Sequence, residues 1–160
     1  MPDLAYLASL PRTRGAAAAL LLDDLGRVLL VKPTYKNGWF LPGGVIEEGE
    51  SPLRACVREC EEELGLVPRL GGLVCVDWGS PHDGVDAVNV FVFGGTITAA
   101  EIGRLRLPPD ELSDHTLAAP EKIPDLAPPH IARRMVPSLR ALGEGRAVYL
   151  EDGREPAPPR

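Results

Sequence analysis

The sequence predicts an α/β sandwich, in which helices cover a sheet of strands, and three observations support that fold. Several short apolar runs lie between turn-forming residues and have the length of strands. A helix with clear start and stop signals stands among them, and an amphipathic helix follows near the C-terminus. At 160 residues, the chain is long enough for one domain with a core that is stable alone.

The expected strands are short apolar runs bounded by Gly, Pro, Asp or Ser, and they lie at 16–22, 27–32, 71–78, 85–93 and 147–150. Asp23-Asp24-Leu25-Gly26 joins the first two and predicts a β-hairpin. Residues 1–15 are expected to be extended or irregular. A further short strand is expected within 40–46, broken by Pro42-Gly43-Gly44.

The central helix is predicted over 52–64. Ser51 is a good N-cap, Pro52 a good first helical residue, and Gly65 a natural stop. At about 100° per residue, one apolar stripe is expected. It contains Leu53, Cys56, Val57, Cys60 and Leu64.

The C-terminal half is expected to contain two more helices and a long loop. One helix is predicted near 109–114, after Pro108, and residues 115–129 are predicted to form a loop rich in Pro and Ala. The amphipathic helix is predicted at 129–142. Residues 1–154 are interpreted as a single domain, and the Pro-rich tail 155–160 as disordered.

Carboxylates crowd the last turns of the central helix. Glu59, Glu62 and Glu63 share about 100° of arc there, whereas Glu61 points elsewhere. A helix C-terminus favours cations, and like charges one turn apart repel, so the pattern favours a bound hard cation such as Mg²⁺ or Mn²⁺. Taken alone, the cluster also fits a solvated Glu-rich turn, since Glu is a good helix former.

The complete pattern resembles the signature of the Nudix hydrolase family. That signature runs Gly, five residues, Glu, seven residues, then Arg-Glu-aliphatic-any-Glu-Glu-any-Gly-aliphatic. The matching residues are Gly44, Glu50, Arg58, Glu59, Glu62, Glu63, Gly65 and Leu66. Cys60 replaces the aliphatic residue, and the lead-in Trp39–Gly44 is also similar to the family's. The resemblance is strongest over 16–112.

The resemblance implies a mixed sheet between helices and metal-dependent hydrolysis of a diphosphate bond in a nucleoside diphosphate derivative. Such a derivative is a nucleotide sugar, an ADP-ribose-like compound or a modified nucleoside triphosphate. The cofactor is expected to be Mg²⁺ or Mn²⁺. Glu59 and Glu63 are the expected direct metal ligands, Glu62 is next, and the Gly43 carbonyl supplies a further oxygen.

Arg58 stays protonated and cannot act as a base, so we expect it to pair with Glu50 or a helix carboxylate and to orient it. The resemblance leaves the general base open. Glu101 is the favoured candidate, with Asp110 and Glu111 as alternatives that look like an ordinary first helical turn.

Substrate contacts are expected from Lys32, Tyr35 and Trp39, the aromatic rings stacking on a base and the lysine meeting phosphate. The competing interpretation is that Trp39 packs beside the strand and that Lys32 is an ordinary hairpin charge.

A net charge of −6 argues against broad contact with nucleic acid or with an anionic membrane. The three cysteines lie in apolar patterns, which indicates that they are reduced residues of the core. Because the chain also has no long apolar segment, we expect a cytoplasmic protein. The expected partner is a small-molecule nucleotide, and a homodimer is possible.

Three other functions compete with the hydrolase. A catalytically weak nucleotide-binding or regulatory module would show damaged box carboxylates, which are intact here. Prenyl diphosphate isomerisation would need a cysteine facing the pocket. Removal of a terminal phosphate from RNA is disfavoured by the acidic balance.

Overall fold

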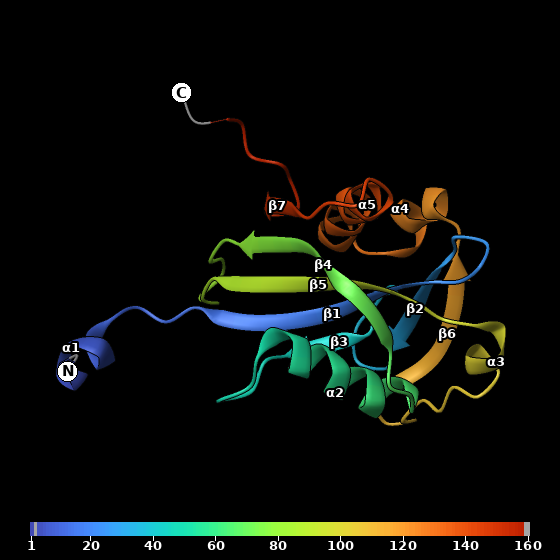
Figure 1. Ribbon diagram of the computed structural model, residues 1–160, viewed down its shortest axis with the longest axis horizontal. Helices are drawn as coiled ribbons and strands as arrows, with labels where there is room; N and C mark the ends of the chain where they lie inside the picture. The colour runs from blue at the N-terminus through green and yellow to red at the C-terminus, as the bar shows by residue number, and fades with distance from the viewer. Residues whose placement is uncertain (2, 159–160) are drawn as a thin grey trace.

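A seven-stranded mixed sheet with helices on both faces organises the fold, which confirms the predicted α/β sandwich (Figure 1). The computed structural model describes residue 1 and residues 3–158. The strands are β1 Arg14–Leu22, β2 Val28–Pro33, β3 Gly43–Val45, β4 Arg69–Gly79, β5 Val88–Thr96, β6 Leu112–Ala118 and β7 Val148–Glu151. The helices are α1 Leu4–Ser9, α2 Pro52–Leu64, α3 Ala99–Ile102, α4 Ile123–Leu126 and α5 Pro129–Gly143, with a 3₁₀ turn at Pro120–Lys122.

The strand order is β6-β2-β1-β5-β4-β7, and β3 pairs with β1 beside this path. The β1–β5 and β4–β7 pairs are parallel, and the other pairs are antiparallel. Strands β1 and β2 pair only where Leu22 faces Val28, next to the predicted turn. Beyond that point β1 pairs with β3 instead, so the two strands of the hairpin diverge.

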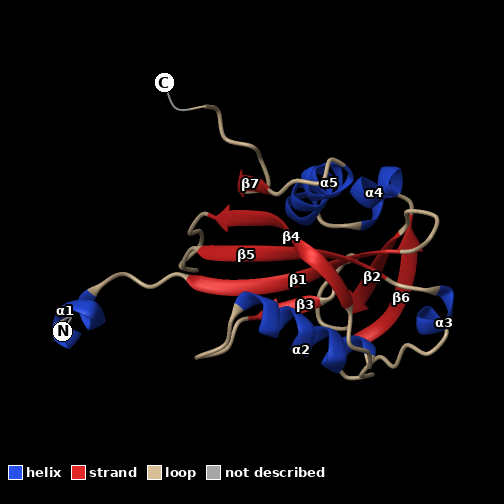
Figure 2. Cartoon of the chain, viewed as in Figure 1, coloured by secondary structure: helices blue, strands red, loops and turns tan. Residues whose placement is uncertain are grey.

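The sheet separates two apolar cores. Helix α2 lies on one face of the sheet, and α4 and α5 lie on the other (Figure 2). Neighbouring residues of β1 enter different cores, with Leu20 on the α5 side and Leu21 on the α2 side. A strand covered on both faces needs apolar residues throughout, which explains the unbroken run over 16–22.

Helix α2 forms as predicted. The Ser51 hydroxyl accepts a hydrogen bond from the Arg54 N–H, and Gly65 ends the helix in the left-handed conformation at φ 70°. The apolar stripe is rotated from the predicted one, because Ala55 is buried while Leu53 is 47% exposed. Glu59 and Glu63 therefore lie on the face that packs toward the sheet rather than beside it.

Four other predictions differ from the structure. No helix forms at 109–114, and 115–129 is not one long loop, because Leu112–Ala118 pairs with β2 as strand β6. Such long-range pairing overrides the local signal of two prolines. Residues 1–15 include α1, which Asp3 caps by accepting from the Ala5 N–H. The glycines at 43 and 44 do not break the short strand but form it.

The C-terminal predictions fit better. Helix α5 matches the amphipathic pattern, and its Met135 is fully buried. Strand β7 forms the edge of the sheet beside β4. Residues 155–158 belong to no helix or strand, and residues 159–160 of the predicted tail lie outside the described residues. Within the described part of the chain, no helix is long and apolar enough to cross a membrane.

Candidate active site

The glycine strand β3 lies directly against α2, and this contact brings the predicted residues together. The Gly43 N–H donates a hydrogen bond of 2.8 Å to Glu63 Oε2. A Cβ at position 44 would come within 2.4 Å of Glu59 Oε1, and one at position 43 within 2.2 Å of the Ala17 carbonyl oxygen. Only glycine permits so close an approach of strand and helix.

Glu59 and Glu63 are half-buried, and their environment disfavours negative charge. Burial raises the pKa of Glu63 to about 7, and the charges of Glu59 and Glu111 add to the effect, although the Gly43 hydrogen bond opposes it. Burial also raises the pKa of Glu59, against the opposing hydrogen bond from Arg58. Two desolvated carboxylates one helical turn apart favour the binding of positive charge beside them.

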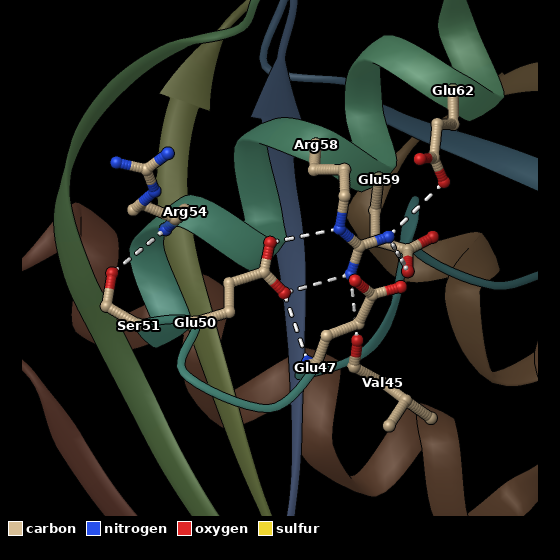
Figure 3. Close-up of polar contacts among 8 residues, drawn as sticks. All are labelled: Val45, Glu47, Glu50, Ser51, Arg54, Arg58, Glu59 and Glu62. Carbon is tan, nitrogen blue, oxygen red and sulfur yellow. Dashed lines mark hydrogen bonds and ion pairs between the residues drawn. The ribbon is translucent and has the colours of Figure 1, made fainter.

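Arg58 binds the surrounding carboxylates together (Figure 3). Its Nε and one terminal nitrogen donate to both oxygens of Glu50, at 2.9 and 3.0 Å. The other terminal nitrogen lies 2.8 Å from Glu59 Oε1 and 3.2 Å from Glu62 Oε2. A fifth bond reaches the Val45 carbonyl on β3. The predicted pairing of Arg58 with Glu50 and with helix carboxylates is therefore present.

Glu50 has a second function in the loop before α2. Its Oε2 accepts a hydrogen bond from the Glu47 N–H, and the bonds from Arg58 are the main cause that lowers its pKa. A carboxylate fixed by this many donors stays ionised. The structure thus places Glu50 as the group that orients Arg58.

The donor set fits a hard divalent cation in part. In the described residues, no group of three His, Cys, Asp or Glu side chains is arranged to hold a metal ion. The protein offers the carboxylates of Glu59 and Glu63, one helical turn apart, while Glu62 is 57% exposed and its Oε2 lies 3.2 Å from Arg58. Magnesium is commonly held by one or two carboxylates together with substrate phosphates and water, so this pair suits it. The contact of Gly43 with Glu63 is through its N–H, and its carbonyl as a ligand stays a prediction.

A cavity of ≈ 180 Å³ opens onto Glu63, where β1 and β2 diverge. Tyr35 and Lys36 of the loop after β2 line it. Burial lowers the pKa of Lys36, and the charge of Glu63 opposes that change. Trp39 and Lys32 do not line this cavity: Trp39 packs on the core next to α4, and Lys32 Nζ lies 5.8 Å from its ring centre.

Glu101 is engaged elsewhere. It caps α3 by accepting from the Thr98 N–H and hydroxyl, both at 2.8 Å, and pairs with Arg69 at 2.9 Å. All three bonds are to Oε2 of the Glu101 carboxylate, and the hydrogen bonds from Thr98 lower its pKa. Glu101 thus caps α3, and its role as general base stays a prediction. The Thr98-x-x-Glu101 spacing is the sequence pattern of a capping box and could have indicated that Glu101 caps a helix.

Glu111, one of the alternative bases in the sequence interpretation, lies close to the start of β6. It precedes β6 rather than starting a helix, and its carbonyl accepts from the Thr34 N–H at 2.9 Å. Its charge contributes to the raised pKa of Glu63, Glu59 and Tyr35, after burial as the main cause. The loop before β6 thus brings a third carboxylate toward the pair on α2.

The family model for the NUDIX domain matches residues 12–139. The chain belongs to the NUDIX domain family. The match spans every element from β1 to most of α5, and it confirms the resemblance deduced from the box residues.

Two relatives are similar to this chain over part of their length. An RNA pyrophosphohydrolase of Psychrobacter cryohalolentis is 40% identical over 67 residues, 41% of this chain and 39% of that protein. A CMP-5'-(N-acetyl-N-hydroxy-3-aminopropyl)phosphonate hydrolase of Streptomyces rubellomurinus is 32% identical over 126 residues, 64% of this chain and 55% of that protein. The chain thus spans about two fifths to just over half of these relatives.

Solved NUDIX structures share the fold over most of the chain. A MutT NUDIX hydrolase from Burkholderia pseudomallei superposes with a TM-score of 0.67 and 26% identity, covering 82% of this chain and 99% of that one. A UDP-X diphosphatase superposes with a TM-score of 0.73 and 22% identity, covering 94% and 76%.

Proposed function

We propose that this NUDIX protein hydrolyses a diphosphate bond in a nucleoside diphosphate derivative with the help of Mg²⁺ or Mn²⁺. The observation that carries the proposal is the half-buried pair of Glu59 and Glu63 against the glycine strand, with Glu63 also lining the cavity. Such a pair is electrostatically unfavourable alone and becomes favourable beside a dication. The named hydrolases among its relatives support the same reaction class.

A cation held by Glu59 and Glu63 would neutralise diphosphate oxygens and favour attack at phosphorus. The side chains keep their carboxylates in position for it. Arg58 holds Glu59 from one side, and the Gly43 N–H holds Glu63 from the other. Glu50 in turn fixes Arg58 by two hydrogen bonds. Partners of this kind orient metal ligands and set their affinity.

The general base in this proposal is Glu111 rather than Glu101. A water molecule attacks one phosphorus, its proton passes to the Glu111 carboxylate, and the bridging P–O bond breaks to release the second phosphate group. Glu111 is exposed, precedes β6 and acts electrostatically on Glu59 and Glu63. Glu101 is bound to Thr98 and Arg69 and has no such influence on the pair.

The substrate is proposed to be a small nucleotide, with Tyr35 and Lys36 at the cavity mouth as contacts. Tyr35 is 73% exposed and can stack on a ring. The expectation that a nucleic-acid partner is unlikely is weakened, because relatives are named RNA pyrophosphohydrolase and m7GpppN-mRNA hydrolase. An RNA end presents the same diphosphate chemistry as a free nucleotide.

The test is release of phosphate or nucleotide from a panel of nucleoside triphosphates, nucleotide sugars, ADP-ribose and 5′-triphosphorylated RNA, with Mg²⁺ and with Mn²⁺. Glu63→Gln is measured beside the wild type, and Glu61→Gln, on the exposed side of α2, is the matched control. We expect metal-dependent cleavage that Glu63→Gln abolishes and Glu61→Gln keeps. Cleavage that persists in the absence of a divalent metal, or in Glu63→Gln, would contradict the proposal.

A further inference from the structure

The cavity extends from Glu63 to the inner side of α5, where it meets a charged residue. Apolar side chains form most of its far wall, with Val90 from β5 and Ile131 and Met135 from α5. Arg134 is the charged group at this end of the cavity. A cavity of ≈ 180 Å³ is smaller than the roughly 300–1,000 Å³ of whole-ligand sites, so it suits one ring system of a substrate.

Arg134 is held in place by a buried carboxylate. Asp77 of β4 is only 1% exposed, and its two oxygens accept bonds from Arg134 Nε at 2.7 Å and from the Gly153 N–H at 2.9 Å. The Arg134 side chain itself is 17% exposed. A guanidinium clamped at Nε has a fixed plane, which determines where its terminal nitrogens point.

The terminal nitrogens of Arg134 are available to a ligand. Within the described residues, the hydrogen bonding of this side chain is through Nε. No buried side-chain nitrogen or oxygen there lacks a partner, so the terminal nitrogens of Arg134 reach solvent, and the residue lines the cavity. The two terminal nitrogens form a pair of parallel N–H donors, and such a pair matches two adjacent acceptor atoms on a ligand in the cavity that Arg134 lines.

The charge of the Asp77–Arg134 pair selects the kind of acceptor. Asp77 already neutralises Arg134, so a second anion in this apolar end would leave a net buried negative charge, which is costly. A neutral ring edge with two acceptors carries no such cost. Guanine offers O6 and N7 side by side, whereas adenine places an amino donor beside N7 and would oppose the guanidinium.

We propose that this cavity binds the base of a guanine nucleotide, with the Arg134 terminal nitrogens donating to O6 and N7. Asp77 acts as the positioning residue that fixes the guanidinium. The inference rests on the proposed function, because it places the diphosphate at the Glu63 end of the same cavity. It adds a substrate class, the 6-oxopurine nucleotides, and a residue that selects it.

Equilibrium binding tests the base preference without turnover or metal. Calorimetry in EDTA measures the Kd of GMP, IMP and AMP, where IMP and AMP differ at the 6-position that Arg134 is proposed to read. We expect GMP and IMP to bind roughly 5- to 150-fold tighter than AMP. Equal affinities for IMP and AMP in the folded wild type would overturn the proposal.

Arg134→Gln supplies the sharper test, because a glutamine amide pairs with adenine N6 and N7. We expect this variant to lose the preference for IMP and to gain affinity for AMP. Arg134→Gln alone leaves the buried Asp77 carboxylate unpaired, which can prevent folding. The double variant Asp77→Asn, Arg134→Gln removes both charges and keeps the test valid if the single variant does not fold. Arg133→Gln is the matched control, because Arg133 binds the Asp152 carbonyl and does not line this cavity.

Three further outcomes bear on the role of Arg134 and on the proposed hydrolysis. A preference for IMP that survives in Arg134→Gln would refute the role of Arg134. Tighter binding of UDP-glucuronate than of UDP-glucose, lost in Arg134→Gln, would assign the guanidinium to a carboxylate and also overturn the guanine site. Preferential GMP binding by a protein that cleaves no substrate would uphold this inference while the proposed hydrolysis fails.

Discussion

Replacing Glu63 with Gln tests the electrostatics of the site in the metal-free protein. The carboxyl ionises near 4.5 in a solvated chain, and burial raises its pKa to about 7 in the fold. Between these pH values the folded state holds a proton that the unfolded state has lost, so the stability falls as pH rises through this window. A difference of about 2.5 pKa units corresponds to about 3 kcal/mol.

The assay is urea denaturation of wild type and Glu63→Gln in EDTA at pH 4.5 and pH 8.5. Gln keeps an acceptor for the Gly43 N–H but does not titrate. The difference in unfolding free energy between variant and wild type should therefore shift by about 3 kcal/mol in favour of the variant at pH 8.5. A shift below about 1 kcal/mol would refute the reasoning, since it lies close to the extrapolation error of such measurements. Glu61→Gln, on the exposed side of α2, should show no shift.

A divalent cation should offset the loss of stability that the ionised Glu63 causes in the wild type at high pH. Binding only to the folded state stabilises by about 2.7 kcal/mol at a hundredfold excess over Kd. We expect Mg²⁺ or Mn²⁺ to raise the unfolding free energy of wild type at pH 8.5 and to leave Glu63→Gln unchanged. Equal stabilisation of both proteins would place the metal away from this carboxylate.

Three further predictions concern neighbouring residues. Arg58→Lys should lower activity roughly 10- to 100-fold while circular dichroism shows that α2 is kept, because one ammonium cannot replace five directed hydrogen bonds. Unchanged activity would show that Arg58 does not orient the carboxylates. Gly44→Ala should lower activity with little loss of thermal stability, since its Cβ meets the movable end of the Glu59 side chain. Gly43→Ala should lower the free energy of unfolding by about 2 kcal/mol or more, because its Cβ meets the backbone of β1 and residue 43 has a φ of 151°. Thermal melts that rank the two variants in the opposite order would contradict this. Glu111→Gln should lower kcat by about 10²–10⁴-fold. Glu101→Gln should keep kcat and lose about 0.5–2 kcal/mol of unfolding free energy, because it weakens a helix cap. If Glu101→Gln lowered kcat and Glu111→Gln did not, Glu101 would be the base.

Local signals in the sequence were sufficient for α2 and for the residues of its box. Ser51, Pro52 and Gly65 act within one turn of the helix ends, so their effect needs no distant partner. Arg58 and Glu50 are only eight residues apart, and the sequence of this segment was enough to predict that Arg58 pairs with Glu50 or with a helix carboxylate. The family resemblance rested on these positions, and the match over 12–139 confirms it.

Contacts between distant segments were decided by the tertiary structure. Residues 112–118 carry a weak local pattern and become β6 only because β2 lies beside them. The same pairing brings Glu111 toward α2 and leaves Glu101 as a cap. The orientation of α2 on the sheet likewise turned Glu59 and Glu63 inward and left Leu53 exposed.

The sequence by itself determined the helix, its carboxylates and the family, because each depends on residues a few positions apart. The tertiary structure decided what those carboxylates face and which side chains share their cavity. Arg134 and Asp77 are 57 residues apart, and no local pattern connects them. They meet only because α5 packs on β4, and burying a charge there is tolerated only when its partner is already in place.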